Sequence, residues 1–447
     1  MTTLPFIRCH SASGWIAWQT GKGISYAQFW RDVGALAARL PDRRYVLNHC
    51  DDRYHFLVAL AAALCRQQIS LFPANRAPRV LADLCAEFPD LYCLTDDPQE
   101  SAPCERVPFE SATASGKNFA PASFAPDRTV AIAFTSGSTG TPQRHERTWG
   151  GFVAEAIRAG EVLGLHPEKG GCIVSSVPPQ HMYGFIASIM LPLTWGYVMH
   201  AARPFYPEDM RRALHDLPAS GMLVTTPMQL RACVLEAVAL PGLDCILSSA
   251  APLDADIAAR AAIMYKTPVI EFYGSTETGA IAIRRQADRD IWRTFRDITI
   301  AARDDGLEVR APWFAPQTLN DLATVHDDRE FTLHGRTAEM VKIGGKRMML
   351  GDLTAQLLAI DGVQDGAFYL PDAMPGVVRD AMPGHEARLM AFAVAPGRSA
   401  EQVLAALRER IDPVFLPRPL KLVQRLPRTA TGKLPRAALA AILRDGY

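Results

Sequence analysis

The run of small and hydroxylated residues TSGSTGTP, at residues 135–142, is the first feature of the sequence that suggests chemistry. It follows the apolar segment TVAIAF at residues 129–134, which is typical of a buried strand. Glycines let the backbone approach a ligand closely, and N–H and hydroxyl groups are donors that suit an anion. No Gly-Lys-Ser/Thr sequence closes the run, so it is not a Walker A loop. We expect a phosphate-binding loop, with a polar Ser/Gly linker as the alternative.

Two further motifs combine glycine and hydroxyl groups with a charged side chain. YGSTETG, at residues 273–279, directly follows the apolar run PVIEF, and PRTATGK occupies residues 427–433. Glu277 in the first motif and Lys433 in the second are these charged side chains. A solvated loop carboxylate is the alternative to a site role for Glu277.

The elements that must position these motifs alternate along the N-terminal part of the chain. Strand-like apolar runs are separated by segments of helix length, and they begin at Tyr45, Ile69, Thr129, Cys172, Gly221, Cys245 and Pro268. Such alternation predicts βαβ units and mostly parallel sheets, whose ligands bind beyond the carboxyl ends of the strands. After residue 335 the pattern changes to helices near Leu353 and Glu401 and strands near Ala367 and Leu389. We therefore predict an α/β fold with a large N-terminal domain over residues 1–334 and a small, mobile α+β C-terminal domain over residues 335–447.

Composition excludes several classes of function. The 447 residues include 47 Lys plus Arg and 47 Asp plus Glu, so no overall charge recruits nucleic acid or an anionic membrane. The nine cysteines have no CxxC spacing, and the N-terminus lacks a signal-peptide pattern, so we expect reduced thiols and a cytoplasmic location. The apolar run at residues 183–202 is interrupted by Pro192, Gly196 and His200. A buried helix, a turn and a strand explain it better than a membrane span.

The three motifs, in this order, resemble those of the ANL superfamily, which contains acyl-CoA synthetases, peptide-synthetase adenylation domains and luciferases. TSGSTGTP is similar to the family's phosphate loop, YGSTETG to its YGxTE motif, and PRTATGK to its PRTxxGK motif. Lesser matches are SAAPL at residues 249–253, Asp321, the Gly335-Arg336 pair and KIGGKR at residues 342–347. The resemblance implies an enzyme that uses ATP and Mg²⁺ to convert a carboxylic acid into an acyl-adenylate, releases pyrophosphate and passes the acyl group to a thiol.

The resemblance also implies roles for individual residues. Lys433 would bridge the acyl carboxylate and the α-phosphate, Thr276 would contact the α-phosphate, and Glu277 would be the metal ligand. Tyr273 would contact the adenine, Asp321 the ribose hydroxyls, and Arg336 the ribose or phosphate; all three belong to a larger nucleotide-binding set. That set is Thr135, Ser136, Gly137, Ser138, Thr139, Gly140, Ala250, Tyr273, Gly274, Asp321 and Arg336.

The sequence departs from the family pattern at two positions. The phosphate loop of the family usually continues Pro-Lys, whereas this chain has Gln143 and then Arg144 after the proline, so Arg144 is the candidate for the missing cation. The family commonly has an acidic hinge residue where this chain has Ala338. Residues 335–339 are nevertheless the expected hinge for a C-terminal domain that rotates between an adenylating and a thiolating pose.

The segment VPPQHMYGF, at residues 177–185, resembles the segment that lines the acyl pocket in the family. Amino-acid-activating members carry an Asp there, and none stands between Val177 and Trp195, which disfavours a free amino acid because its buried ammonium would lack a partner. His181 and Tyr183 with Phe185 suit a flat aryl acid, and ordinary core aromatics are the alternative. The predicted pocket consists of His181, Tyr183, Ser249 and Gly274.

Combined with TSGSTGTPQRHERTWG, this segment also resembles the short AMP-ligases of xanthomonadin and aryl-polyene pathways. That resemblance implies a hydroxylated aryl acid loaded onto an acyl carrier protein in trans, with CoA as the other acceptor considered. The basic C-terminal region is either a solvated face or a docking surface for CoA phosphates or an acidic carrier. A medium-chain fatty acyl-CoA synthetase is the alternative enzyme, and a non-catalytic nucleotide-binding protein is the alternative of another class.

Overall fold

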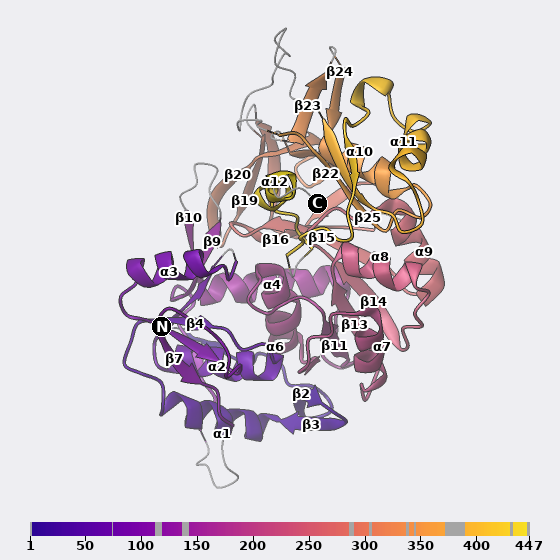
Figure 1. Ribbon diagram of the computed structural model, residues 1–447. Helices are drawn as coiled ribbons and strands as arrows, with labels where there is room; N and C mark the ends of the chain where they lie inside the picture. The colour runs from indigo at the N-terminus through magenta and orange to yellow at the C-terminus, as the bar shows by residue number, and fades with distance from the viewer. Residues whose placement is uncertain are drawn as a thin grey trace. The chain divides into compact units, whose positions relative to one another are not determined.

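The computed structural model of the chain describes residues 2–73, 75–111, 119–135, 143–285, 290–303, 306–336, 339–343, 346–371, 389–429 and 432–444. The chain forms two compact units, which Figure 1 colours along the sequence: residues 1–298 with 310–315, and residues 299–309 with 316–447. This division falls earlier than the predicted domain boundary between residues 334 and 335. That boundary marks the point about which the C-terminal domain would rotate, and it stays a prediction.

The larger sheet of the first unit has a parallel centre. Its strands follow the spatial order β17-β16-β15-β14-β13-β11-β12-β2-β3, in which β15, β14, β13, β11, β12 and β2 are parallel neighbours and the strands at either edge are antiparallel. The strands are β2 (Trp15–Gln19), β3 (Lys22–Ser25), β11 (Cys172–Ser175), β12 (Val198–His200), β13 (Gly221–Thr225), β14 (Leu243–Ser248), β15 (Val269–Ser275), β16 (Gly279–Arg284) and β17 (Trp292–Thr294). The helices α7 (Pro207–His215), α8 (Pro227–Leu235) and α9 (Ala255–Tyr265) pack on it through the cluster that contains Val174, Leu223, Ile246 and Val269.

A second sheet in the first unit follows the order β10-β9-β5-β4-β6-β7, parallel except for the edge strand β10. Its elements are β4 (Tyr45–Asn48), β5 (Ile69–Phe72), β6 (Leu91–Thr95), β7 (Glu105–Pro108), β9 (Thr129–Thr135) and β10 (Gln143–Thr148), with the helices α1 (Tyr26–Ala37), α2 (Arg53–Cys65), α3 (Pro78–Glu87) and α4 (Trp149–Leu163). The short strands β1 (Leu4–Pro5) and β8 (Ser123–Phe124) pair with each other. Both sheets are built from βαβ units, which confirms the predicted α/β class.

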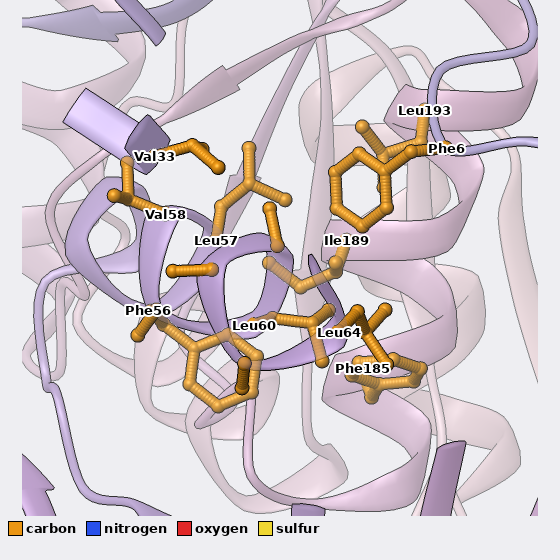
Figure 2. Packing of buried hydrophobic residues seen from close by; sticks show 14 of the residues in the cluster. Phe6, Val33, Phe56, Leu57, Val58, Leu60, Leu64, Phe185, Ile189 and Leu193 are labelled. Carbon is orange, nitrogen blue, oxygen red and sulfur yellow. The ribbon is translucent and has the colours of Figure 1, made fainter. Parts of the chain in front are cut away.

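Helix α2 lies at the centre of the first unit's core because it is apolar all round. Of its 13 residues, 11 are buried. Figure 2 shows Phe56, Leu60 and Leu64 of this helix gathered with Phe185 and Ile189 from the segment that follows β11. The predicted acyl-pocket segment is therefore anchored on a buried helix.

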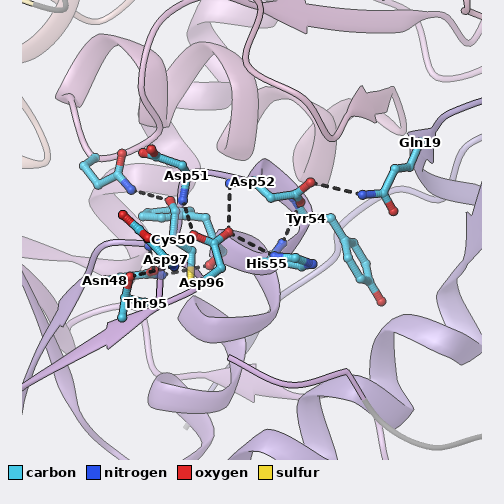
Figure 3. Close-up of polar contacts among 12 residues, drawn as sticks. Gln19, Asn48, Cys50, Asp51, Asp52, Tyr54, His55, Thr95, Asp96 and Asp97 are labelled. Atoms are coloured by element: carbon cyan, nitrogen blue, oxygen red, sulfur yellow. Dashed lines mark hydrogen bonds and ion pairs between the residues drawn. The ribbon is translucent and has the colours of Figure 1, made fainter. Parts of the chain in front are cut away.

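The N-terminus of α2 is fixed by two carboxylates (Figure 3). Asp52 caps the helix by accepting from the backbone N–H groups of Tyr54 at 2.9 Å and His55 at 3.1 Å. Asp96 accepts from the N–H groups of Asp51 at 2.9 Å and Asp52 at 3.0 Å and also bonds the His55 ring. Because the donors are main-chain groups, this network sets where α2 begins.

The apolar run at residues 183–202 has the predicted helix–turn–strand structure. It contains α5 (Met182–Phe185), the π-helical turn η1 (Ile186–Met190), α6 (Leu191–Trp195) and then β12. Gly196 ends the helical part with φ of 70°. Within the part of the chain that the structure describes, no helix combines the length and apolarity needed to cross a membrane.

The second unit has the predicted α+β pattern after residue 335. Its strands are β18 (Thr299–Arg303), β19 (Gly306–Ala311), β20 (Phe314–Leu319), β21 (Asp321–Val325), β22 (Glu330–Arg336), β23 (Met340–Ile343), β24 (Lys346–Met349), β25 (Asp365–Tyr369), β26 (Met390–Val394) and β27 (Leu420–Leu422). Its helices are α10 (Leu350–Leu358), α11 (Ala400–Arg408), the 3₁₀ turn η3 (Pro413–Phe415) and α12 (Arg436–Arg444). Leu353, Phe368, Ala391 and Leu407 belong to one core cluster, so α10 and α11 pack on the β25–β26–β27 sheet.

Candidate active site

The predicted site residues of the first unit follow the carboxyl ends of parallel strands. The registers of β11, β13, β14 and β15 bring their last residues to one edge of the larger sheet. The pocket segment with His181 and Tyr183 follows β11, and the segment with Ser249 and Ala250 follows β14. Strand β15 ends with Tyr273, Gly274 and Ser275, and the turn to β16 carries Thr276 and Glu277. The structure therefore brings these candidates to the edge where ligands of parallel sheets bind.

The turn between β15 and β16 is closed by its own side chains. Ser275 N–H donates to Thr278 Oγ1 at 3.1 Å, and Thr278 N–H donates to Ser275 Oγ at 3.2 Å. A Cβ at Gly274 would lie 1.9 Å from the carbonyl oxygen of Gly279, so only glycine fits this close antiparallel approach. The turn presents Glu277 with 27% of its side chain exposed.

His145 lies between Glu277 and the start of the predicted phosphate loop. Its Nε2 is 4.0 Å from Glu277 Oε1 and 3.2 Å from Thr135 Oγ1. Burial lowers the pKa of His145, and the nearby Glu277 carboxylate opposes that shift. Ser136, Gly137, Ser138, Thr139 and Gly140 lie outside the described residues.

Arg144 is the candidate for the cation that the family's phosphate loop usually supplies. It lies on the face of β10 opposite to that of His145. Residues alternate along a strand, so His145 and Arg147 share one face and Arg144 the opposite one. The Arg144 guanidinium pairs with Glu87 of α3 and lies 4.9 Å from the ring centroid of Phe88. Sequence reasoning missed His145, and strand alternation in QRHERT is the signal that indicates it.

Two buried ion pairs flank the β15–β16 hairpin, and sequence reasoning missed both. Arg147 Nη2 is 2.6 Å from Glu155 Oε2, and Arg284 Nη2 is 2.8 Å from Glu271 Oε2. Burial raises the pKa of each carboxyl to about 7, and the arginine beside it opposes the shift. A glutamate within an apolar run, as in GGFVAEAI and PVIEFY, is the available sequence signal.

The loop after β14 is held against β15. Ser249 Oγ donates to the carbonyl of Phe272 at 2.8 Å, and Leu253 N–H donates to Glu271 Oε1 at 3.3 Å. Ala250 has a φ of 77°, a left-handed conformation that is uncommon for a residue with a Cβ. The loop conformation is therefore imposed by these contacts.

Tyr273 stands beside an aromatic and cationic stack. Its ring centroid is 5.5 Å from that of Trp292, over which the Arg284 guanidinium lies at 4.4 Å. Its ring is only partly buried. The contact of Tyr273 with adenine stays a prediction.

The aromatic residues of the pocket segment differ in their surroundings. Phe185 is 1% exposed and packs against Phe152, with ring centroids 4.8 Å apart, so it is a core residue. Tyr183 is also buried, and its hydroxyl donates to the carbonyl of Leu247 at 2.7 Å, with that of Thr225 at 3.2 Å. His181 is half-buried and is the N-cap residue that precedes α5. Pocket roles for His181 and Tyr183 stay predictions.

The remaining predicted residues belong to the second unit. Asp321 and Arg336 are register partners at the open end of the β21–β22 hairpin, so they lie opposite each other. Lys433 is exposed and follows a loop closed by Arg428, whose guanidinium donates to Asp365 at 2.7 and 2.8 Å and to the carbonyl of Gly432 at 2.8 Å. This loop fixes the backbone from which the Lys433 side chain extends.

The chemistry of the turn fits Mg²⁺ bound together with a substrate. Among the described residues, no group of three or more His, Cys, Asp or Glu side chains could enclose a metal. Mg²⁺ usually keeps several waters and takes one or two carboxylates plus substrate phosphates. The single, partly exposed carboxylate of Glu277 fits this kind of site.

Comparison with known proteins gives a consistent family. The model of the AMP-binding enzyme family matches residues 39–310, and that of the AMP-binding enzyme C-terminal domain matches residues 375–433. A 4-coumarate–CoA ligase from Halorhodospira halophila is 30% identical over 319 residues, which cover 67% of this chain and 73% of the relative. A second 4-coumarate–CoA ligase, from Rhodobacter capsulatus, is 29% identical over 59% of this chain and 68% of its own length.

Solved structures show the same fold. The o-succinylbenzoate coenzyme A synthetase from Bacillus subtilis in complex with AMP superposes with a TM-score of 0.78 at 17% identity, covering 98% of each chain. A benzoate CoA ligase from Burkholderia xenovorans LB400 gives a TM-score of 0.76 at 17% identity, covering 96% of this chain and 97% of that one. These matches agree with the family predicted from the three motifs. The chain therefore belongs to the AMP-binding enzyme family and is an AMP-forming ligase.

Proposed function

We propose that the enzyme activates a hydroxylated aryl acid with ATP, releases pyrophosphate and transfers the acyl group to a phosphopantetheine thiol. The observation that carries the proposal is the gathering of Ser249, Tyr273, Thr276 and Glu277 at the carboxyl edge of the parallel strands. The family membership supports adenylate formation. The acceptor is either CoA or an acyl carrier protein supplied in trans.

Adenylation brings two anions together, so the site must offset negative charge. The acid's carboxylate attacks the α-phosphate in line, and pyrophosphate leaves. Thr276 would donate to the α-phosphate, and Glu277 would hold Mg²⁺, which neutralises phosphate charge when it is bound. His145 faces the same carboxylate from β10. Lys433, from the second unit, is proposed to contact the acid and the α-phosphate.

The preference for an aryl acid rests on the pocket segment and on the relatives. No acidic residue stands between Val177 and Trp195 to hold an ammonium group. Relatives are named 4-coumarate–CoA ligases, and structural neighbours are named for anthranilate and benzoate. A medium-chain fatty acid is the competing substrate class.

Exposed basic side chains near the C-terminus support an anionic thiol carrier. Arg418, Arg425 and Lys433 are exposed, whereas Arg428 is occupied by Asp365. An acidic carrier protein and the phosphates of CoA are both attracted by such charge. An association rate that falls as salt rises is expected for the carrier protein.

The test is a competition among acids, scored by kcat/KM for pyrophosphate release. The panel contains 4-hydroxybenzoate, a hydroxycinnamate, octanoate and tyrosine, with CoA and a phosphopantetheinylated carrier protein compared as acceptors. We expect a hydroxyaryl acid to lead, because a site that hydrogen-bonds a hydroxyl strongly rejects analogues that lack it. If octanoate with CoA leads, the enzyme is a fatty acyl-CoA synthetase. Release of pyrophosphate with any of the acids excludes the non-catalytic alternative, and release with none of them refutes the hydroxyaryl proposal.

A further inference from the structure

A buried ion pair joins β10 and α4 directly beside the turn that carries Glu277. Arg147 is 5% exposed and Glu155 is 0% exposed, with 2.6 Å between Nη2 and Oε2. The pair lies across the junction of strand and helix, where Thr148 caps α4 by accepting from Gly151 N–H at 3.1 Å. This short, capped connection fixes both side chains relative to each other.

Each member of the pair bonds the main chain of the turn. Arg147 Nη1 donates to the carbonyl of Glu277 at 3.3 Å. Glu155 Oε1 accepts from Ala280 N–H at 2.6 Å. The two ends of the turn are therefore tied to one ion pair, which leaves the Glu277 side chain available.

The turn fits closely over the glutamate. A Cβ at Gly279 would lie 2.3 Å from both carboxylate oxygens of Glu155, and Gly279 has a φ of 70°. Only glycine gives the backbone this conformation and this approach without strain. The Glu155 carboxylate and the backbone of the turn are therefore in a close contact that a side chain at residue 279 would prevent.

Stability alone is a weak reason for such a pair. A buried ion pair is often neutral or destabilising compared with apolar residues of similar volume, because both charges must leave water. The main-chain bonds to Glu277 and Ala280 give this one a specific geometric effect at the site.

We propose that Arg147 and Glu155 are positioning residues that hold the Glu277 turn in the geometry that binds the nucleotide. This rests on the proposed function, in that the turn is taken to contact ATP and its metal. The pair bonds the backbone of residues 277–280 directly, whereas it reaches the segment after β11 only through Phe152, whose ring lies between Arg147 and Phe185. Loss of the pair should weaken nucleotide binding selectively.

The main test replaces both charges by apolar side chains, Arg147→Met with Glu155→Leu. The control is Arg158→Gln with Glu161→Gln on α4, which removes a partly exposed pair, 3.1 Å apart, together with its contacts to Asp297 and Arg296. Affinity for a fluorescent ATP analogue with Mg²⁺ is measured without acid, together with thermal unfolding and separate KM values for ATP and acid. We expect the double variant to fold and to lose about tenfold or more in nucleotide affinity, as supporting residues around metal sites typically do.

The proposal is decided by comparing the change in KM for ATP with the change in KM for the acid. We expect the KM for the acid to stay within about twofold, and Arg147→Lys to recover part of the affinity because an ammonium keeps the charge without the planar fork. Unchanged affinity in a folded double variant, an equal rise in both KM values, or an equal loss in the control would overturn the proposal.

Two further measurements keep the result interpretable. If the double variant does not fold, Arg147→Met alone removes the donor to the Glu277 carbonyl and keeps the Glu155 acceptor for Ala280 N–H, and unchanged nucleotide affinity in it contradicts the proposal. Failure of the proposed function is seen separately, as absence of acid-dependent pyrophosphate release from the unaltered enzyme. The binding comparison does not require turnover.

Discussion

Replacing Arg53 with Met should destabilise the first unit and weaken binding of the acid. Arg53 is fully buried at the start of α2. Its guanidinium donates to five neutral acceptors: Ser188 Oγ at 2.9 Å and the carbonyls of His200 at 3.2 Å, Ala202 at 3.1 Å, Ser175 at 3.0 Å and Val177 at 2.9 Å. Ser175 ends β11, and Val177 begins the predicted acyl-pocket segment. Burial lowers the pKa of Arg53 to about 9, so the group stays charged at neutral pH.

The expected magnitude is a difference of two opposing terms. A hydrogen bond from a charged donor contributes at least about 1.5 kcal/mol, so five contribute about 7 kcal/mol or more. Burial of the charged guanidinium opposes this sum: the fall of the Arg53 pKa from 12.5 to about 9 corresponds to roughly 5 kcal/mol, net of the attraction to Asp52 and the repulsion from Arg203. We therefore expect Arg53→Met to lower the free energy of unfolding by about 2–4 kcal/mol, a value in the range of other broken buried networks.

The assay combines urea unfolding, followed by tryptophan fluorescence, with steady-state kinetics. The matched control is Arg66→Met, at the other end of α2, where the side chain is 39% exposed and 3.6 Å from Asp42. That variant should stay within about 0.5 kcal/mol of the unaltered enzyme. In Arg53→Met we also expect the KM for the acid to rise more than that for ATP. Equal stability of the two variants would refute the reasoning.

Three further outcomes are expected. Lys433→Ala should lower adenylation by about 10²-fold or more and spare thioester formation from supplied acyl-adenylate; equal loss in both half-reactions would indicate a role in folding instead. Glu277→Gln should raise the Mg²⁺ concentration for half-maximal activity by about tenfold, and an unchanged metal dependence would remove Glu277 as a ligand. Burial raises the pKa of Glu271 from 4.5 to about 7, so the folded chain binds more protons than the unfolded chain between these values. The stability that Glu271 contributes is therefore present below about pH 4.5 and lost as the pH rises through 7; Glu271→Gln should flatten this dependence, and parallel pH profiles would contradict it.

The sequence predicts where the candidate residues lie in the fold because strand ends are local features. Apolar runs locate the strands, and the hydroxyl- and glycine-rich motifs follow them directly. The rule that ligands bind at the carboxyl ends of parallel strands then brings Ser249 and Glu277 to one edge. None of these steps requires knowledge of a distant contact.

The ion pairs and the role of β10 could not be predicted in the same way. Alternation puts Arg144 and His145 on opposite faces, and the register of β10 with β9 decides which of them faces the site, since a shift of one residue exchanges the two faces. Glu271 and Arg284 meet only through the register of β15 with β16. Burial of Tyr183 is likewise tertiary, because its hydroxyl bonds the ends of β13 and β14.

Three buried charged side chains of the first unit form hydrogen bonds with the main chain of loops at the candidate site. Arg53 bonds carbonyls at the loop after β11, Glu271 accepts from Leu253 N–H after β14, and Glu155 accepts from Ala280 N–H at the turn after β15. A main-chain bond fixes the path of a loop whatever side chains the loop carries. A substitution at His181 can then change what the pocket binds without removing these main-chain bonds, whereas a substitution at Ser249 also removes the bond from its Oγ to the carbonyl of Phe272. We therefore expect replacement of His181 to alter acid preference at little cost in stability, and replacement of the buried charged groups to do the reverse.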